Sequence, residues 1–234
     1  MGAVNLSLVV PTYNEAENVE AMVKQLSSVL EPIFNESYEI IVVDDDSPDR
    51  TWELAESISN PRLQVIRRVG ERGLATAVVR GWRAAQGDII GVIDGDLQHP
   101  PEVLGKLIAA MNEGAEIAIA SRHVEGGGIS KWSMARRLVS RSAQAIGLVL
   151  LPGAASRVSD PMSGYFLLRR SLIESVPLQP VGYKILLEVL ARTKAKRIRE
   201  VGYFFREREK GGSKAGIGVC LQYIQHLWRL RFGG

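Results

Sequence analysis

Residues 89–101 read Ile-Ile-Gly-Val-Ile-Asp-Gly-Asp-Leu-Gln-His-Pro-Pro, an apolar run that stops at two carboxylates and then enters a loop. Two similar runs, at residues 6–10 and 40–43, also stop at polar clusters, which occupy residues 11–15 and 44–47. Short apolar runs rich in β-branched residues are typical of buried strands. Segments with helical spacing separate these runs, and this alternation predicts an α/β fold with a mostly parallel sheet and helices on both faces.

The alternation of strands and helices continues to residue 121 and then becomes irregular. We expect strands at 6–10, 38–43, 63–67, 89–94 and 116–121, and helices at 18–30, 51–59, 74–85 and 101–112. Beyond these we expect a basic helix within 132–151, a loop at 160–164, a strand at 165–168, a helix at 183–192, a strand at 198–205 and an amphipathic helix at 217–231. With 46% hydrophobic residues, the chain is interpreted as one domain, residues 1–234.

The polar clusters predict a ligand site, because open parallel sheets bind ligands at the carboxyl ends of their strands. Asp94 and Asp96 suit a hard cation, Mg²⁺ or Mn²⁺, which is commonly shared between carboxylates and substrate phosphates. Tyr13 can stack on a base, and Glu15 can accept hydrogen bonds from base or ribose. The motifs G-x-G-x-x-G after the first strand and G-x-x-x-x-G-K-[ST] are missing, which argues against dinucleotide oxidoreductases and P-loop NTPases.

These motifs resemble those of glycosyltransferase family 2, which has the GT-A (Rossmann-like) fold, and within it the dolichol-phosphate or polyprenyl-phosphate mannosyltransferases. The matching segments run in family order along nearly the whole chain: 10–15 (VPTYNE), 43–51 (VDDDSPDRT), 94–102 (DGDLQHPPE), 121–122 (SR), 160–164 (DPMSG), Arg208 and 212–214 (GSK). The resemblance implies a nucleotide-sugar-binding half, residues 1–121, and an acceptor-binding half with membrane-proximal helices, residues 122–234.

The resemblance also implies roles for individual residues. Asp94, Asp96 and Arg122 would be catalytic, and Asp96 and Gln98 would hold the metal. The nucleotide sugar would be held by Pro11, Tyr13, Glu15, Val43, Asp45, Asp94, Gly95, Asp96, Gln98, Arg122, Arg208 and Lys214. The acceptor phosphate would be held by Arg122, Arg136 and Ser140.

The implied reaction is metal-dependent, inverting transfer of mannose from GDP-mannose to dolichyl or polyprenyl phosphate. A phosphate monoester has a second pKa of ~6 and is mostly dianionic at neutral pH, so it needs no general base. His99, His123 and His226 are therefore interpreted as surface or packing residues.

Three other functions stay open. The first two are the same fold with UDP-glucose as donor, and a family 2 transferase with a saccharide acceptor, whose hydroxyl would need a base. The third is a non-catalytic nucleotide-sugar binder that recruits partners at a membrane. Nucleic-acid binding is not expected, because the basic residues are not interleaved with aromatic residues suited to base stacking.

Charge and hydropathy predict peripheral attachment to the cytoplasmic face of a membrane. Between residues 126 and 159 the chain has basic residues and no acid, which suits phosphates or an anionic membrane. The longest uncharged run, residues 142–156, is shorter than the ~20 residues that span a bilayer, so a transmembrane part would be separate or missing from this chain. A single cysteine, Cys220, is consistent with a reducing compartment. The basic residues are Lys131, Arg136, Arg137, Arg141 and Arg157.

Overall fold

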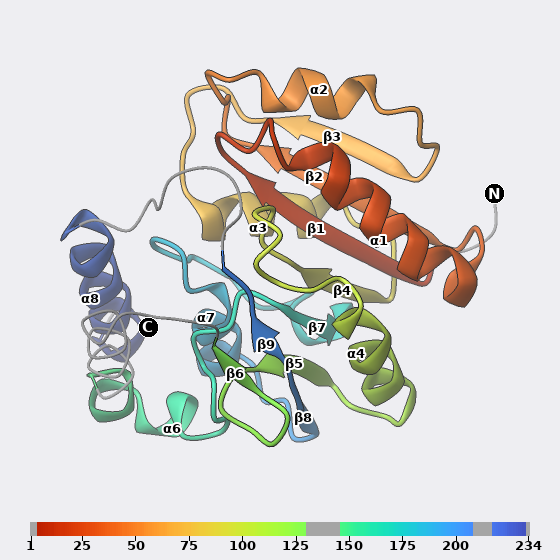
Figure 1. The fold of residues 1–234 in the computed structure, drawn as a ribbon. Helices are drawn as coiled ribbons and strands as arrows, with labels where there is room; N and C mark the ends of the chain where they lie inside the picture. The colour runs from red at the N-terminus through yellow and green to blue at the C-terminus, as the bar shows by residue number, and fades with distance from the viewer. Residues whose placement is uncertain (1–3, 130–145, 208–216, 233–234) are drawn as a thin grey trace.

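The fold is built around a seven-stranded sheet with strand order β3-β2-β1-β4-β7-β5-β8 (Figure 1). The computed structural model describes residues 4–129, 146–207 and 217–232. All neighbouring strands pair in parallel except β7, which is antiparallel to both β4 and β5. The mostly parallel sheet is therefore confirmed. The strands are β1 Leu6–Thr12, β2 Tyr38–Asp44, β3 Leu63–Arg67, β4 Ile89–Val92, β5 Ile117–Ser121, β7 Phe166–Arg169 and β8 Ile198–Gly202.

Helices cover both faces of the sheet, as predicted (Figure 1). One core cluster contains residues of α1, α2 and α4, and the other contains residues of α3, α6, α7 and α8. The helices are α1 Val19–Phe34, α2 Thr51–Ser57, α3 Leu74–Ala84, α4 Val103–Asn112, α6 Pro152–Ala155, α7 Ile185–Arg192 and α8 Ile217–Phe232, with a 3₁₀ helix η1 at Arg170–Leu172.

Strand β1 shows why apolar and polar residues do not alternate along the apolar runs. Leu8 and Val10 belong to the core cluster that contains α1 and α4, whereas Val9 belongs to the cluster that contains α3 and α7. All three side chains are fully buried. A strand buried on both faces is typical of a parallel sheet, and burial of each such side chain stabilises the fold by about 1.5–3 kcal/mol.

The antiparallel strand β7 decides where the second half of the chain meets the first. Because β7 runs against β4 and β5, its first residue, Phe166, lies at the sheet edge where those strands end. The preceding loop, residues 160–165, therefore lies beside the carboxyl ends of β4 and β5. This arrangement brings residues separated by about seventy positions to one edge of the sheet.

The predicted strand at 198–205 is divided in the structure. Strand β8 ends at Gly202, and β9, Phe204–Phe205, pairs with β6, Gly128–Ile129, in a separate two-stranded sheet. The break lies at a close main-chain approach, since a Cβ on Gly202 would come within 2.1 Å of the Glu125 carbonyl oxygen.

Three short elements, β6, α6 and η1, were not predicted, because two to four residues are too few to show a period. Of the predicted helix at 132–151, residues 146–151 are described; residues 146–150 are helical, and Leu151 is not. Across the described parts of the chain, no helix combines the length and apolar character needed to cross a bilayer.

Candidate active site

The ends of β1, β2 and β4 meet at one edge of the sheet. Thr12 and Asp44 are register partners, and the Thr12 hydroxyl donates to Asp44 Oδ2 at 2.7 Å. Gly95 lies against the end of β1, since a Cβ there would be 3.1 Å from Thr12 Cγ2 and 3.3 Å from the Pro11 carbonyl oxygen. The turn that carries Asp94 and Asp96 therefore lies directly on the last residues of β1, as expected for a site at the carboxyl edge.

Asp45 connects this edge to the loop before α3. Its Oδ2 accepts a hydrogen bond from the Gly73 amide at 2.7 Å, and its Oδ1 accepts one from Arg68 Nε at 2.7 Å. Burial raises the pKa of Asp45, and the hydrogen bonds from Gly73 and Arg68 offset only part of that rise. In the same loop, the Arg72 guanidinium lies 3.9 Å from the centre of the Tyr13 ring. The ring that we expect to stack on a base therefore makes a cation–π contact with Arg72.

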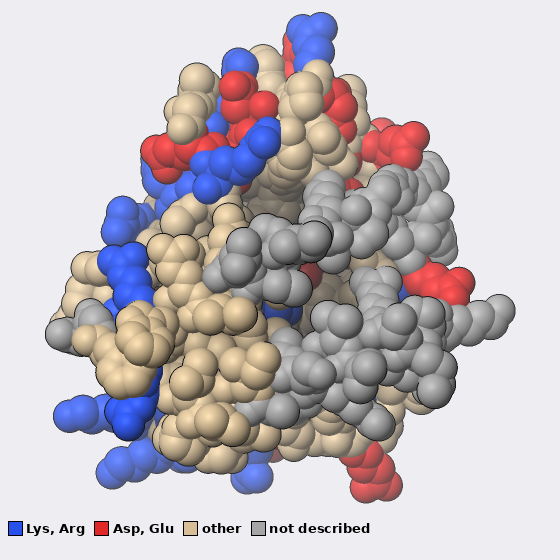
Figure 2. Space-filling view, turned by 90° about the vertical axis from the view of Figure 1, so that its left-hand side faces the viewer, with Lys and Arg blue, Asp and Glu red and all other residues tan. Residues whose placement is uncertain are grey.

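Acidic side chains at this end of the sheet are partnered by arginines. Arg67 Nε donates to Asp46 Oδ1 at 2.6 Å, in addition to the Arg68–Asp45 pair. Figure 2 shows acidic and basic side chains interleaved at the top of one face, over the end of the molecule that α2 and β3 occupy in Figure 1. This pairing lowers the repulsion that the acidic cluster would otherwise exert on an anionic ligand.

Besides Asp45, three predicted nucleotide contacts are buried. The Val43 side chain packs in the core with Val9 and Ile41, so any contact from Val43 to a ligand would come from its main chain. Pro11 is buried at the end of β1. Glu15 is also buried, and its Oε2 accepts a hydrogen bond from Asn18 Nδ2 at 2.7 Å.

Asp96 and Gln98 fit a hard divalent cation. The main-chain N–H of Gln98 donates to Asp96 Oδ1 at 3.1 Å, and the side-chain Nε2 of Gln98 donates to the Arg206 carbonyl oxygen at 3.0 Å. Because the side-chain nitrogen Nε2 donates to Arg206, the side-chain oxygen Oε1 of Gln98 is the atom that could bind a metal. No set of three His, Cys, Asp or Glu side chains converges within the described residues, and Mg²⁺ commonly uses one or two protein oxygens together with substrate phosphates and water.

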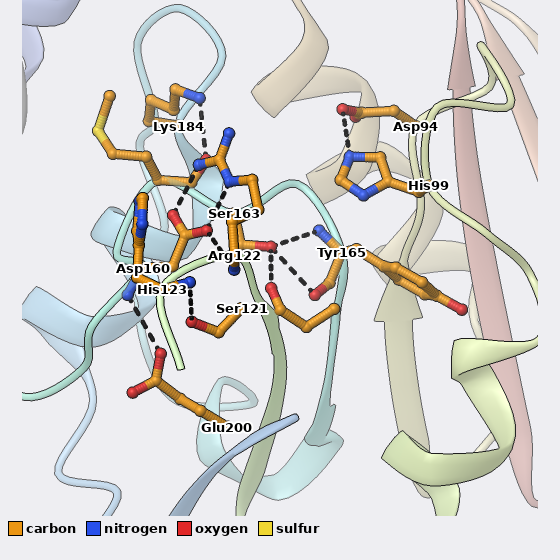
Figure 3. A network of polar contacts seen from close by, with 12 residues as sticks. Asp94, His99, Ser121, Arg122, His123, Asp160, Ser163, Tyr165, Lys184 and Glu200 are labelled. Atoms are coloured by element: carbon orange, nitrogen blue, oxygen red, sulfur yellow. Dashed lines mark hydrogen bonds and ion pairs between the residues drawn. The ribbon is translucent and has the colours of Figure 1, made fainter. Parts of the chain in front are cut away.

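Asp94 contacts His99 (Figure 3), and it lies close to Gly164. Its Oδ2 lies 3.2 Å from His99 Nε2, and a Cβ on Gly164 would come within 2.7 Å of the same oxygen. Asp94 Oδ1 is buried and has no hydrogen-bond partner among the described residues. A buried carboxylate oxygen without a partner is costly, which indicates that a ligand supplies one.

Arg122 and Asp160 form a buried, two-pronged ion pair (Figure 3). Arg122 Nε and Nη2 each donate to an Asp160 oxygen at 2.7 Å, and the Arg122 amide donates to Oδ2 at 3.2 Å. Burial alone would raise the pKa of Asp160, but the hydrogen bonds and charge of Arg122 outweigh it and lower that pKa. Burial likewise opposes the charge of Arg122, and Asp160 outweighs it, so the pKa of Arg122 is raised.

Lys184, just before α7, is a site residue that the sequence did not reveal. Its Nζ donates to the Met162 carbonyl oxygen at 2.9 Å, and it is close enough to Arg122, Asp94 and Asp160 to interact with their charges. Burial, with a smaller contribution from the charge of Arg122, lowers the pKa of Lys184 to about 8, and the charges of Asp94 and Asp160 oppose this shift. No motif marks Lys184, since it reaches the site only through the packing of α7 under the sheet.

Some predicted residues lie elsewhere. Arg136, Ser140, Arg208 and Lys214 fall outside the described residues. The prediction for Arg157 was wrong: its guanidinium donates to the carbonyl oxygens of Leu190 at 2.7 Å and Thr193 at 3.2 Å, and it also contacts that of Ala195, so it stabilises the end of α7.

Comparisons with known proteins agree with the geometry. The family model Glycosyl transferase family 2 matches residues 7–176. A Pyrococcus furiosus protein named dolichol-phosphate mannosyltransferase is 45% identical over 226 residues, 96% of this chain and 63% of that protein. A Saccharomyces cerevisiae protein of the same name is 34% identical, over 97% of this chain and 87% of its own length.

Solved structures show the same fold. Glucosyl-3-phosphoglycerate synthase from Mycobacterium tuberculosis, in complex with Mn²⁺, UDP and glucosyl-3-phosphoglycerate, superposes with a TM-score of 0.72. It is 22% identical and covers 97% of this chain and 80% of its own. With the family model matched over most of the chain, and with relatives of this identity, the chain belongs to glycosyl transferase family 2.

Proposed function

We propose that this chain transfers mannose from GDP-mannose to dolichyl or polyprenyl phosphate, with inversion at the anomeric carbon and with bound Mg²⁺ or Mn²⁺. One observation carries the proposal. Asp94 and Asp96 follow β4 at the same sheet edge where Arg122 and Lys184 are close enough to Asp94 to interact with its charge. Carboxylates for metal and sugar, set beside cations for phosphates, are the groups that a diphosphate-sugar donor and a phosphate acceptor require. The names of the relatives in Pyrococcus and Saccharomyces support mannose as the sugar and dolichol phosphate as the acceptor.

The donor would bind along the carboxyl edge of the first half, residues 1–121. Tyr13 and Asp45 would face the nucleoside, and Asp94 and Gly95 would face the sugar. Asp96 and Gln98 would hold the cation, which when bound would neutralise charge on the diphosphate as it leaves. Among the residues outside the described part, Arg208 and Lys214 would contact the donor phosphates.

Arg122 and Lys184 would stabilise negative charge on the phosphates. Asp160 already holds the Arg122 guanidinium in a fixed orientation, and Met162 does the same for the Lys184 ammonium group. Cationic hydrogen-bond donors that are oriented before the reaction need not reorganise as negative charge develops, and this is the main source of electrostatic catalysis. Arg136 and Ser140 would complete the acceptor phosphate site in the second half, residues 122–234.

The reaction needs no proton transfer to begin. The acceptor phosphate has a second pKa of ~6 and is already ionised at neutral pH. One of its oxygens forms a bond to the anomeric carbon as the bond from that carbon to the diphosphate breaks, and GDP leaves. A single displacement of this kind inverts the anomeric configuration.

Membrane attachment would be peripheral, at the cytoplasmic face. Exposed apolar side chains on α8, Ile224, Trp228 and Phe232, lie on the same helix as Arg229 and Arg231. Apolar rings beside arginines suit an interface between headgroups and acyl chains. The chain spans 63% of the length of the Pyrococcus relative.

The test is transfer of label to lipid. The chain is incubated with polyprenyl phosphate, Mg²⁺ or Mn²⁺, and either radiolabelled GDP-mannose or radiolabelled UDP-glucose, and the mixture is extracted with organic solvent. Label from GDP-mannose in the organic phase supports the proposal. Label from UDP-glucose alone would assign a glucosyltransferase, and transfer only to a saccharide would overturn the lipid acceptor.

Metal dependence is tested in the same assay. Asp96→Ala should abolish transfer and remove the response to Mn²⁺, whereas Gly105→Ala, on α4 with open space around its Cβ position, should behave as the unsubstituted chain. Chelation by EDTA should stop transfer, and added Mg²⁺ should restore it. Normal turnover by Asp96→Ala would contradict the metal role.

A further inference from the structure

His99 lies next to the candidate metal ligands and contacts Asp94, the carboxylate that faces the donor sugar in the proposed function. We propose that His99 is a positioning residue, which fixes the Asp94 carboxylate so that Oδ1 is presented to the sugar. This inference rests on the proposed function, because it concerns the sugar of that donor. It assigns a role in the reaction to a residue that sequence reasoning had placed among surface or packing residues.

The hydrogen bond from His99 to Asp94 defines the imidazole tautomer. His99 is buried, with 3% of its surface exposed, and its Nε2 lies 3.2 Å from Asp94 Oδ2. A carboxylate oxygen accepts hydrogen bonds, so Nε2 carries the hydrogen and donates it. The other ring nitrogen, Nδ1, is buried and has no partner among the described residues. The ring therefore makes one directed polar contact, and that contact is with Asp94.

Three aromatic rings hold the imidazole in its plane. The Tyr203 ring is stacked on it, with centroids 5.4 Å apart and an interplanar angle of 27°. Tyr165 and Phe205 meet it edge to face, at 5.5 Å and 5.1 Å. Stacked and edge-to-face geometries are the arrangements that aromatic rings prefer, so these contacts stabilise one orientation of the imidazole. The rings come from the segment before β7 and from the end of β8 through β9, so the fold itself orients His99.

The result is a carboxylate fixed on two sides. His99 binds Asp94 Oδ2 (Figure 3). Gly164 lies against the carboxylate so closely that a Cβ would approach Oδ2 to 2.7 Å. Rotation of the carboxylate would break the His99 contact, and movement toward the loop is blocked. Oδ1, buried without a partner among the described residues, is left as an oriented acceptor. A sugar hydroxyl is the donor that the proposed substrate offers to it.

Two substitutions separate this role from packing. His99→Phe keeps an aromatic ring among Tyr165, Tyr203 and Phe205 but has no donor. His99→Gln loses the ring but can place its Nε2 amide near the position of the imidazole Nε2. If His99 only fills space, kcat should follow stability, and the Phe variant should be the more active. If His99 positions Asp94, His99→Gln should have the higher kcat, although His99→Phe should have the higher thermal stability.

We expect His99→Phe to lower kcat by ~10–100-fold, the range typical of removing an orienting partner, and His99→Gln to lower it by less. Tm should be higher for His99→Phe than for His99→Gln. Binding of GDP, which carries no sugar, should change less than about twofold in both. Gly105→Ala, on α4 with open space around its Cβ position, is the control, and its kcat should be unchanged. A His99→Phe variant as active as His99→Gln, or more so, would overturn the proposal.

A second measurement does not depend on turnover. Long-range ¹H–¹⁵N NMR of the imidazole should show a hydrogen on His99 Nε2. A hydrogen on Nδ1 instead would overturn the contact with Asp94. If the unsubstituted chain transfers no sugar from any nucleotide sugar, the proposed function fails, and the NMR result still decides whether His99 holds Asp94.

Discussion

Gly164 lies against the carboxylate of Asp94, so closely that a Cβ at residue 164 would be 2.7 Å from Asp94 Oδ2 and 3.0 Å from Oδ1. The two residues belong to segments that follow β4 and precede β7, and only the antiparallel insertion of β7 brings them together. The lack of a side chain at Gly164 therefore leaves room for the Asp94 carboxylate.

Gly164→Ala should lower transfer activity by about 10–100-fold, because the carboxylate must move to admit the methyl group and displacement of a positioned group by about 1 Å has that effect. Stability should fall by no more than about 1–3 kcal/mol, the usual cost of overpacking. Activity assays and urea unfolding measure the two effects. Gly105→Ala, with open space around its Cβ position on α4, is the control and should keep full activity. An active Gly164→Ala variant would show that Asp94 tolerates displacement.

Asp160→Asn should destabilise the fold strongly, because it leaves the Arg122 guanidinium buried without its counter-charge. Removal of one partner from a buried ion pair costs about 3–5 kcal/mol, and urea unfolding should show a loss of that size. The double variant Arg122→Gln with Asp160→Asn removes both charges and should recover much of the stability while transfer stays low. Recovery of transfer in the double variant would contradict a direct role for Arg122.

Lys184 should set an alkaline limit on activity. Its pKa is lowered to about 8 by burial, so the amine is a cation below that pH and becomes neutral above it. Because kcat/KM reports the ionisation of the free enzyme, it should fall as pH rises through about 8. Lys184→Arg, which stays charged, should move the fall to higher pH. Lys184→Met should have kcat/KM about tenfold or more lower at pH 7, the loss of one hydrogen bond to a charged group. If Lys184→Met keeps the same alkaline limit, another group causes it.

Glu188 should make the docking of α8 sensitive to acid. Its carboxylate is fully buried and accepts hydrogen bonds from His226 Nε2 at 2.8 Å on α8 and from Arg192 Nε at 2.6 Å on α7. Burial alone would raise the pKa of Glu188, but these hydrogen bonds and one from the Gln179 amide outweigh it, and the pKa is lowered. A lowered native pKa contributes stability above the pKa of an unfolded glutamate, ~4.3, and this contribution is lost as pH falls through the native value.

Glu188→Gln should therefore lower the free energy of unfolding by about 1–3 kcal/mol at pH 7, and by less near pH 3. Thermal unfolding followed between pH 3 and pH 7 measures this difference. Glu174→Gln is the matched control, since Glu174 is largely exposed and pairs with Arg170 at 3.7 Å, and its effect should stay below about 1 kcal/mol at every pH. Parallel curves for the unsubstituted chain and Glu188→Gln would contradict the assignment.

The sequence could predict the first half of this fold well because each of its elements is recognisable locally. The run at 89–93 and its carboxylates predict a buried strand with a polar end, and parallel pairing then brings Asp44 beside Thr12 without further information. The second half could not be predicted to the same depth. The break at Tyr203 depends on Gly202 meeting the main chain of residues 125–127, a contact between distant segments that leaves no period in the sequence.

Charge in the sequence also does not reveal what a charge will contact. Arg157 shares a basic stretch with Arg136, yet it binds the carbonyl oxygens at the end of α7, because that helix end lies beside α6 in the folded chain. Lys184 has no motif around it, and it becomes a site residue because α7 packs against the face of the sheet below the carboxyl edge.

By itself, the sequence determined the family, the mostly parallel sheet and the placing of Asp94, Asp96 and Gln98 at a strand end, because apolar periodicity and strand-end chemistry are local properties of the chain. The tertiary structure decided which groups hold those side chains. Gly164, Lys184 and Asp160 act on the site through contacts between segments that are far apart in sequence, and such contacts depend on the position of β7 in the sheet. His99 is close to Asp94 in sequence, but the rings that orient it come from Tyr165, Tyr203 and Phe205.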